Sequence, residues 1–439
     1  EIFELHGFQP LETPSMENLA TLTGKYGEEG DRLIFKILNN GLHDKKEEDK
    51  AKFRVEVDKV LSRPYSSSLV TERALRYDLT IPFARYVVMH QNELAFPFRR
   101  YQMQPVWRAD RPQKGRYREF WQCDCDVVGS TSLINEAELL SIYQSAFAEL
   151  KVPVVIKINS RKLLAALSEI CDMPEKMMDI TIAMDKLDKI GWVGVAGELK
   201  ERGIPDEGIW QIEKVINVTG NNDEKLAAYA DIMQHSTSGI EGINELSKTL
   251  AYYQQLTGGT GDLASNIVVD ISLARGLNYY TGVIVEVVCS HPDVKMGSIG
   301  GGGRYDDLTG LFGLKGLSGV GVSFGVDRIY DVIEELGVFP KQLAEGTQVM
   351  IVNFGGENET YALNILQRFR SEGIAAEIYP DTSKFDKQMK YANKRGIGFV
   401  VLPGDEERHK AMVSLKNFTT GEQKMLSVAE CIDAIRASN

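Results

Sequence analysis

The sequence of 439 residues has few cysteines and no long hydrophobic run. Its five cysteines are an odd number, lie far apart and include no Cys-x-x-Cys pair, which supports neither a disulfide framework nor a structural zinc site. No stretch of about 18 apolar residues occurs, and the first residues lack the profile of a signal peptide. We therefore expect a reduced, cytoplasmic protein that does not enter a membrane and has no metal site of its own.

The sequence also lacks a positive net charge. Lysine and arginine together number 50, against 62 aspartates and glutamates, and the formal net charge is −12. Because no overall positive field draws in a polyanion, any nucleic acid must be bound by local basic patches. Hydrophobic residues make up 43% of the chain and charged residues 26%, which excludes a disordered or fibrous protein. At about 150 residues per domain, the length predicts several domains.

Strand and helix patterns divide the chain into segments, which we place at residues 1–158, 159–262, 263–338 and 345–439. The second is a block of leucine, alanine, glutamate and lysine at helical spacing, and strand patterns return after it. The first core therefore resumes after a helical insertion. The chain opens at Glu1 without a methionine, as though inside a helix, and we expect further residues before it.

The last segment follows a regular alternation. Strands are predicted at 348–354, 374–379 and 397–402, with helices at 359–372 and 384–395 between them. Such a βαβαβ order predicts a parallel sheet with helices on both faces.

A local basic cluster stands out against the acidic chain. Between Arg99 and Arg118 there are seven basic residues and one acid, Asp110, and aromatic residues are interleaved among them. Desolvated arginine is costly unless an anion pairs with it. We favour a phosphate-binding β-hairpin with Arg108 on a phosphate, and a cluster of structural ion pairs is the alternative.

The strand after this cluster alternates in character. Period two places Phe120, Gln122, Asp124 and Asp126 on one face, where a ring could stack a base and the polar groups could bind a small cationic ligand. The alternative is the solvent face of an edge strand. Asp78 and Thr80 are also two residues apart, on what we expect to be another strand, and would suit a primary ammonium group.

Two further segments combine glycine with arginine. Arg275–Gly282 is ambiguous taken alone, whereas Gly297–Tyr305 and Gly319–Arg328 crowd glycines around a strand and a helix start. Arg328 would lie in a first helical turn, where the helix dipole disfavours a cation, so we expect it to meet an anion. The glycines have neither P-loop nor dinucleotide-binding spacing.

These segments together resemble the class II aminoacyl-tRNA synthetases, and most specifically the histidyl-tRNA synthetases. Gly7–Pro14 is similar to the end of the first class II motif, which forms the dimer, Arg108–Phe120 to the second and Gly319–Arg328 to the third. Arg275-Gly276-Leu277-x-Tyr279-Tyr280, together with Gly302-Gly303-Arg304-Tyr305, is particular to the histidine enzymes.

The resemblance implies an α+β catalytic core, in which helices flank a mixed antiparallel sheet, with a helical insertion and a C-terminal α/β anticodon-binding domain. It also implies a homodimer that activates histidine with ATP, accompanied by Mg²⁺, and transfers the amino acid to the 3′ end of tRNA(His). Two alternatives remain. One is a synthetase-like regulator of the first enzyme of histidine biosynthesis, and the other is a class II synthetase for a different amino acid.

Site residues follow from the same resemblance. It assigns the catalytic role to Arg108 and Arg275. The ATP-binding residues are then Arg108, Asp110, Arg116, Phe120 and Arg328. The histidine-binding residues are Asp78, Thr80, Gln122, Asp126, Arg275, Tyr279, Tyr280 and Tyr305. The chain departs from the family pattern at Asn278, where many relatives have Asp, and at Asp126, where bacterial relatives often have Glu.

Overall fold

The computed structural model describes residues 1–24, 27–62, 66–258, 266–274, 280–339 and 346–437. The chain divides into two compact units, Glu1–Gly337 and Val338–Asn439. The finer segment limits given above stay a prediction. None of the helices in the described ranges is long and apolar enough to cross a membrane.

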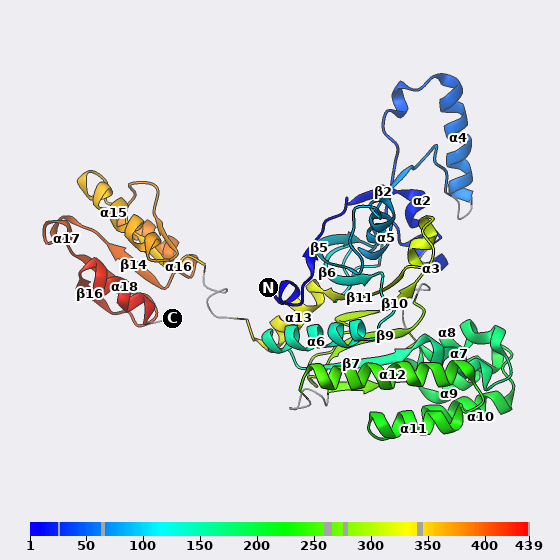
Figure 1. Ribbon diagram of the computed structural model, residues 1–439. Coiled ribbons are helices and arrows are strands. Elements are labelled where there is room, and N and C mark those ends of the chain that lie inside the picture. The colour runs from blue at the N-terminus through cyan, green and yellow to red at the C-terminus, as the bar shows by residue number, and fades with distance from the viewer. Residues whose placement is uncertain (25–26, 63–65, 259–265, 275–279, 340–345, 438–439) are drawn as a thin grey trace. The chain divides into compact units, whose positions relative to one another are not determined.

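The first unit is built on an eight-stranded sheet (Figure 1). In spatial order its strands are β1 (Gln9–Pro10), β5 (Phe98–Trp107), β6 (Glu119–Val128), β11 (Ser318–Gly325), β10 (Gly300–Asp306), β9 (Val283–Cys289), β7 (Val154–Ser160) and β8 (Ile267–Val269). The two outer pairs, β1 with β5 and β7 with β8, are parallel, and all other neighbours are antiparallel. The mixed antiparallel sheet is therefore confirmed.

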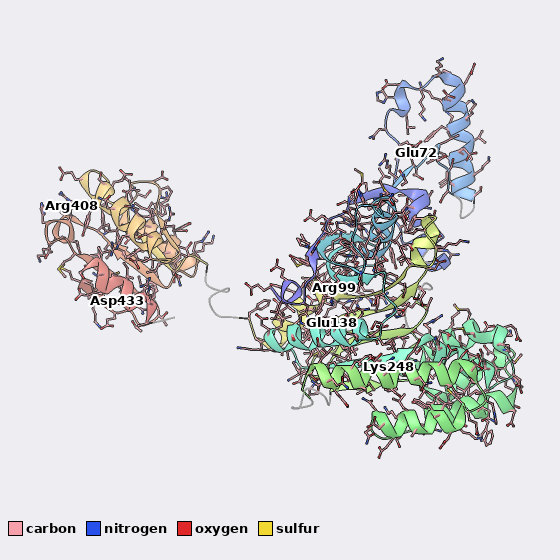
Figure 2. The ribbon with its side chains drawn as sticks, viewed as in Figure 1. Glu72, Arg99, Glu138, Lys248, Arg408 and Asp433 are labelled. Atoms are coloured by element: carbon pink, nitrogen blue, oxygen red, sulfur yellow. The ribbon has the colours of Figure 1, made fainter. Side chains whose placement is uncertain are left out.

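Opposite faces of this sheet pack against different helices. Helix α6 (Ile134–Glu149) covers one face, where Tyr143 and Phe147 pack against Phe324 of β11. Arg99 of β5 reaches this helix and forms a 2.5 Å ion pair with Glu138 (Figure 2). On the other face, Val128 of β6 packs in a cluster with helix α5 (Thr80–Met89).

The start of α5 corrects one prediction. Asp78 and Thr80 do not share a strand, because β4 (Arg73–Leu75) ends before them and Thr80 is the first residue of the helix. Asp78 Oδ1 accepts a 3.1 Å hydrogen bond from the backbone N–H of Ile81, which satisfies one of the free amides of the first turn. The helix thus holds the Asp78 side chain at its amino end.

Short elements surround the sheet. Strands β2 (Met16–Asn18), β4 and β3 (Lys36–Ile37) form a three-stranded sheet. The remaining elements are α1 (Ile2–Leu5), α2 (Leu19–Leu22), α3 (Gly27–Arg32), η1 (Leu42–Asp44), α4 (Glu47–Ser62), η4 (Leu308–Phe312) and α13 (Val326–Leu336). Helix α4, in the charged stretch, buries none of its residues, as its composition suggests.

The insertion between β7 and β8 is helical, as predicted. It consists of α7 (Arg161–Glu169), η2 (Pro174–Lys176), α8 (Met177–Met184), α9 (Leu187–Glu201), α10 (Asp206–Ile216), α11 (Asn222–Ile232) and α12 (Thr237–Leu256). Helix α12 packs against α6 and α7, which ties the insertion to the sheet (Figure 1).

The second unit has a five-stranded sheet in the order β13-β12-β14-β15-β16. Its elements are β12 (Val349–Ile351), α15 (Glu357–Ser371), β13 (Ala376–Ile378), α16 (Phe385–Lys394), β14 (Phe399–Leu402), α17 (Asp405–His409), β15 (Val413–Asn417), β16 (Gln423–Leu426) and α18 (Val428–Arg436). The βαβαβ part is parallel, but β15 and β16 add an antiparallel hairpin. The parallel pairing predicted for the three strands of the βαβαβ part is therefore confirmed. The hairpin lies beyond those strands, where a short turn at 418–422 lets β16 return beside β15.

Candidate functional site

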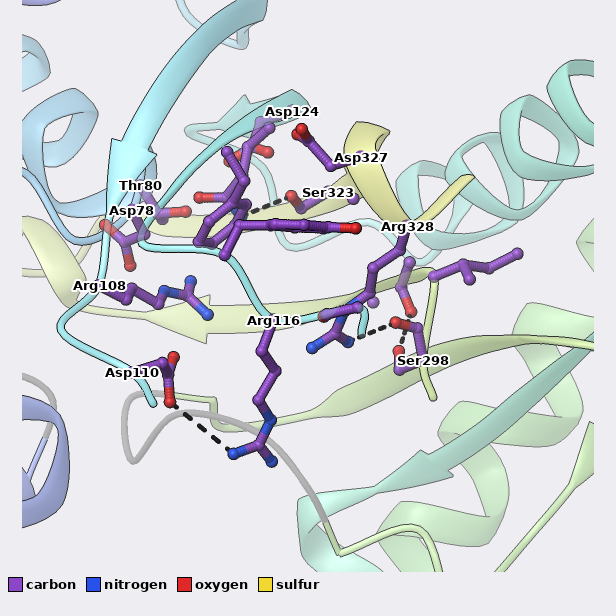
Figure 3. Close-up of a pocket in the computed structure, with 18 of the residues that line it drawn as sticks. Asp78, Thr80, Arg108, Asp110, Arg116, Asp124, Ser298, Ser323, Asp327 and Arg328 are labelled. Carbon is purple, nitrogen blue, oxygen red and sulfur yellow. Dashed lines mark hydrogen bonds and ion pairs between the residues drawn. The ribbon is translucent and has the colours of Figure 1, made fainter. Parts of the chain in front are cut away.

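The first unit contains a cavity of about 240 Å³, and residues of β6, β10 and β11 form part of its wall (Figure 3). Its wall comes from segments that are distant in the sequence. The lining residues are Asp78, Thr80, Arg108, Asp110, Gly115, Arg116, Tyr117, Phe120, Gln122, Asp124, Tyr280, Ser298, Ile299, Gly300, Gly301, Ser323, Gly325, Asp327 and Arg328. We call the side with Arg108, Arg116 and Arg328 the basic end and the side with Gln122 and Asp124 the acidic end, although Asp110 lies beside Arg116 and Asp78 lies near Arg108.

Arg108 is held at the basic end by contacts on several sides. It follows β5 directly, and its backbone N–H donates a 3.0 Å hydrogen bond to the carbonyl of Arg118, which continues the hairpin ladder. Its Nε donates to the Tyr77 carbonyl at 3.1 Å, and the guanidinium lies over the rings of Tyr77 and Phe120, 4.3 and 5.1 Å from their centroids. These contacts fix the guanidinium where it faces the cavity (Figure 3).

Two more arginines reach the cavity from other elements. Arg116 lies 3.8 Å from the Asp110 carboxylate, across the loop between β5 and β6. Arg328, in the first turn of α13, donates 2.6 Å hydrogen bonds to the carbonyls of Gly115 and Ser298. It thereby ties α13 to the hairpin loop, and the anion expected at this residue stays a prediction.

The basic cluster of the sequence therefore divides in two. Arg108 and Arg116 line the cavity, as the phosphate-binding interpretation requires. Arg99 instead pairs with Glu138, and Arg100 is completely buried in a 2.9 Å ion pair with Asp126. The arginines of the hairpin stem thus form structural ion pairs. Only those at its tip are placed to bind a phosphate.

The polar face predicted for β6 forms the inner wall of the cavity. Phe120, Gln122 and Asp124 all line it, and β6 is a central strand, which excludes the edge-strand alternative. The Gln122 amide donates a 2.9 Å hydrogen bond to the hydroxyl of Ser323 on β11. Asp78 and Thr80 enter the same wall from the start of α5.

Asp126 lies one step further along β6. Its side chain accepts a 2.6 Å hydrogen bond from the Tyr305 hydroxyl, besides the ion pair with Arg100. A side chain at Gly321 would overlap the Asp126 carboxylate, so the glycine gives this acid its space. Burial raises the pKa of Asp126, and Arg100 and Tyr305 oppose the rise. The described cavity wall includes neither Asp126 nor Tyr305.

The chain is similar to known proteins over nearly its whole length. The family description "Histidyl-tRNA synthetase" matches residues 70–329, and "Anticodon binding domain" matches 348–438. The histidine–tRNA ligase of Phocaeicola vulgatus is 49% identical over 437 residues, 100% of this chain and 93% of that protein. The ligase of Christiangramia forsetii is 52% identical over 425 residues, 97% of this chain and 91% of that one.

The chain belongs to the histidyl-tRNA synthetase family.

A solved structure agrees with this assignment. The crystal structure of histidyl-tRNA synthetase from Nostoc sp. PCC 7120 matches with a TM-score of 0.78 at 29% identity, over 100% of this chain and 93% of that one. The class II catalytic core and the separate anticodon-binding domain are thus shared with the family. Arg275 and Tyr279 of the histidyl-tRNA synthetase motif lie outside the described residues, whereas Tyr280 lines the cavity.

Sequence reasoning left some cavity residues of this synthetase without a role. Asp124 was placed on the correct face of β6, but the resemblance assigned it nothing. Ser323 and Asp327 lie within the third motif, and Ser298 lies just before β10. Asp327 accepts a 2.7 Å hydrogen bond from the backbone N–H of Trp121, which joins α13 to β6. Alternation along β11 could have identified Ser323, because it faces the same side as Asp124.

Proposed function

We propose that this protein is a histidine–tRNA ligase, which forms histidyl-adenylate from histidine and ATP and transfers histidine to the 3′ end of tRNA(His). The observation that carries the proposal is the single cavity where Arg108, Arg116 and Arg328 face a wall containing Asp78 and Gln122. A polyphosphate needs the first set of charges, and an α-ammonium group needs the second. Membership of the family supports both assignments.

ATP occupies the basic end in this proposal. Arg108 binds the α-phosphate, while Phe120 stacks one face of adenine and Arg328 packs on the other face. Arg116 contacts the polyphosphate, and Asp110, 3.8 Å away, holds the Arg116 side chain ready. Mg²⁺ arrives on the β- and γ-phosphates of the nucleotide.

Histidine occupies the acidic end. Asp78, Thr80 and Gln122 take the α-ammonium group, and the backbone N–H of Ile81 keeps Asp78 in place. Asp126, Tyr280, Tyr305 and Tyr279 enclose the imidazole. The hydrogen bond between Tyr305 and Asp126 orients the carboxylate at this inner end.

The chemical step is an in-line attack of the histidine carboxylate on the α-phosphorus of ATP. A bond forms between the carboxylate oxygen and phosphorus, and the bond to the bridging oxygen of pyrophosphate breaks. No protein base is required, since the attacking oxygen is already ionised. Arg108 and Arg275, on opposite sides of the α-phosphate, stabilise the charge that develops there. Fixed positions of both substrates supply the rest of the acceleration.

Two larger partners complete the proposal. Residues 345–439 bind the anticodon of tRNA(His), and the insertion contacts the acceptor stem.

Two copies of the chain form a homodimer through the first motif, Gly7–Pro14. Phe3 stacks on Tyr101 and meets the ring of Phe8, a residue of this motif, edge-on at the outer end of the sheet, where β1 leaves an edge.

Pyrophosphate exchange with each of the twenty amino acids tests the function. We expect ATP formation from labelled pyrophosphate with histidine alone. Exchange with another amino acid would assign the chain to a different specificity. Complete lack of exchange would favour the regulatory alternative.

A further inference from the structure

Asp124 is an acid of the cavity wall to which the proposed function gives no task. It lies on β6 between Gln122 and Asp126, and its side chain is only 2% exposed. Its Oδ1 has no hydrogen-bond partner among the described residues, although it lies at the wall of the cavity (Figure 3). A buried acceptor without a donor is costly, and a ligand with a suitable N–H would remove that cost.

The groups around Asp124 add negative charge to this end of the cavity. Ser323 lies opposite Asp124 on the neighbouring strand β11. Its hydroxyl hydrogen-bonds the Asp124 carboxylate and accepts a hydrogen bond from the Gln122 amide. Two cations act on Asp124: Arg100, from β5, which already pairs with Asp126 at 2.9 Å, and Arg76, which directly follows β4. Asp78, from the start of α5, adds a third acid. Three carboxylates thus interact at this end of the cavity, and Arg100 already pairs with one of them.

Burial is the main reason that the pKa of Asp124 rises to about 7; Arg100 opposes this rise, and Asp126 adds to it. Near neutral pH the carboxyl group therefore carries a proton in a fraction of the molecules. A free histidine ring titrates close by, at about 6.5. The pKa values of the Asp124 carboxyl group and the histidine ring are thus similar, so one proton can be shared between them.

We propose that Asp124 is a further specificity-determining residue, whose carboxylate hydrogen-bonds a ring nitrogen of bound histidine and holds the ring as imidazolium. The inference rests on the proposed function. The proton can come from either group. A protonated Asp124 transfers its proton to the neutral ring, or the ring binds already protonated to an ionised Asp124. Both routes give a carboxylate paired with a ring that carries two N–H groups.

The order of side chains along β6 favours the ring over the α-ammonium group. Alternate residues of a strand are about 7 Å apart. Phe120, at the nucleotide end, is followed by Gln122 and then by Asp124. Because the reacting carboxylate must lie near Arg108, the α-ammonium group beside it falls near Gln122. The ring, which is further from the carboxylate, then reaches Asp124.

The test compares the full-length wild type with Asp124→Asn by histidine-dependent pyrophosphate exchange. We expect the KM for histidine to rise about tenfold or more, the loss expected for one buried hydrogen bond to a charged group, while the KM for ATP stays within twofold. 1,2,4-Triazole-3-alanine, an isostere whose ring stays neutral near pH 7, should be used less well than histidine by the wild type. The variant should lose this preference.

Glu119→Gln is the matched control, because Glu119 is an exposed acid at the start of the same strand and accepts a hydrogen bond from the Trp107 indole at 2.8 Å. We expect its kinetics to be unchanged. An unchanged KM for histidine in Asp124→Asn, or equal losses for histidine and ATP, would overturn the inference. Failure of the wild type to use histidine would instead reject the proposed function.

A second measurement does not depend on whether the variant folds. Histidine labelled with ¹⁵N in the ring, bound to the wild type at pH 7.5, should show both ring nitrogens protonated, although the free ring is mostly neutral at that pH. A neutral bound ring would refute the role of Asp124.

Discussion

Arg304 of β10 and Glu136 of α6 form a two-pronged ion pair in the interior of the first unit. Nε of the arginine lies 2.5 Å from one carboxylate oxygen, and a terminal nitrogen lies 2.7 Å from the other. Both side chains are almost fully buried, at 4% and 2% exposed. Arg304 also donates to the Ser130 carbonyl at 3.0 Å, so it fastens both α6 and the end of β6 to the strand that carries Tyr305.

This pair leads to a prediction about stability. We expect Glu136→Gln to lower the free energy of unfolding by about 3–5 kcal/mol, because the arginine is left as an uncompensated buried charge. Urea denaturation measures the change. Glu138→Gln, two residues along α6, removes the partly exposed pair with Arg99 and should cost about 1 kcal/mol or less. Equal losses in the two variants would contradict this account.

A second prediction concerns the rate of adenylation. Arg108→Lys keeps a positive charge but loses the planar fork and its packing over Tyr77 and Phe120. We expect the rate constant for adenylate formation in single turnovers to fall about 100-fold or more. Arg99→Lys, in the stem of the same hairpin and away from the cavity wall, should leave the rate within twofold. A normal rate in Arg108→Lys would remove this residue from the reaction centre.

Arg275→Ala tests the other proposed catalytic arginine. We expect it to lower the same rate constant strongly while the KM for histidine changes little, since its interaction would form only in the transition state. Steady-state and single-turnover exchange separate the two effects. A change confined to KM would make Arg275 a binding residue only.

Asp124 also gives stability a pH dependence. Its pKa in the folded protein, about 7, is above its ordinary value of 3.8, so the folded state binds more protons between these values. The contribution of this residue to stability is therefore present below about pH 4 and lost as the pH rises to about 7. Asp124→Asn should flatten this part of the profile and be at least as stable as the wild type at pH 8. A less stable variant at pH 8 would indicate a structural role for the carboxylate.

The two units predict separable activities. The second unit has its own buried core, which includes Phe369 and Val401, so a chain ending at Gly337 loses none of the described cavity wall. We expect this shortened chain to retain pyrophosphate exchange within a fewfold, while charging of tRNA(His) falls about tenfold or more. Equal loss of both activities would show that the second unit supports the active site.

The sequence predicted more of the local structure than of the connections between elements. Strand periodicity correctly placed Phe120, Gln122 and Asp124 on one face of β6, and the helical block was identified by its spacing. Asp78 was misplaced on a strand, because its carboxylate caps the first turn of α5 and the residue types did not reveal that contact. The hairpin of β15 and β16 was missed because no prediction was made beyond residue 402.

By itself, the sequence determined which residue types are available and in what order, because periodicity, glycine spacing and charge act between near neighbours in the chain. Only the tertiary structure decided which of the clustered arginines are free to meet a ligand. Arg100 and Arg108 are eight residues apart and chemically identical, yet one is buried against Asp126 and the other faces the cavity. The difference lies in strands and helices brought together from distant parts of the chain, since burial and charge pairing depend on distance in space.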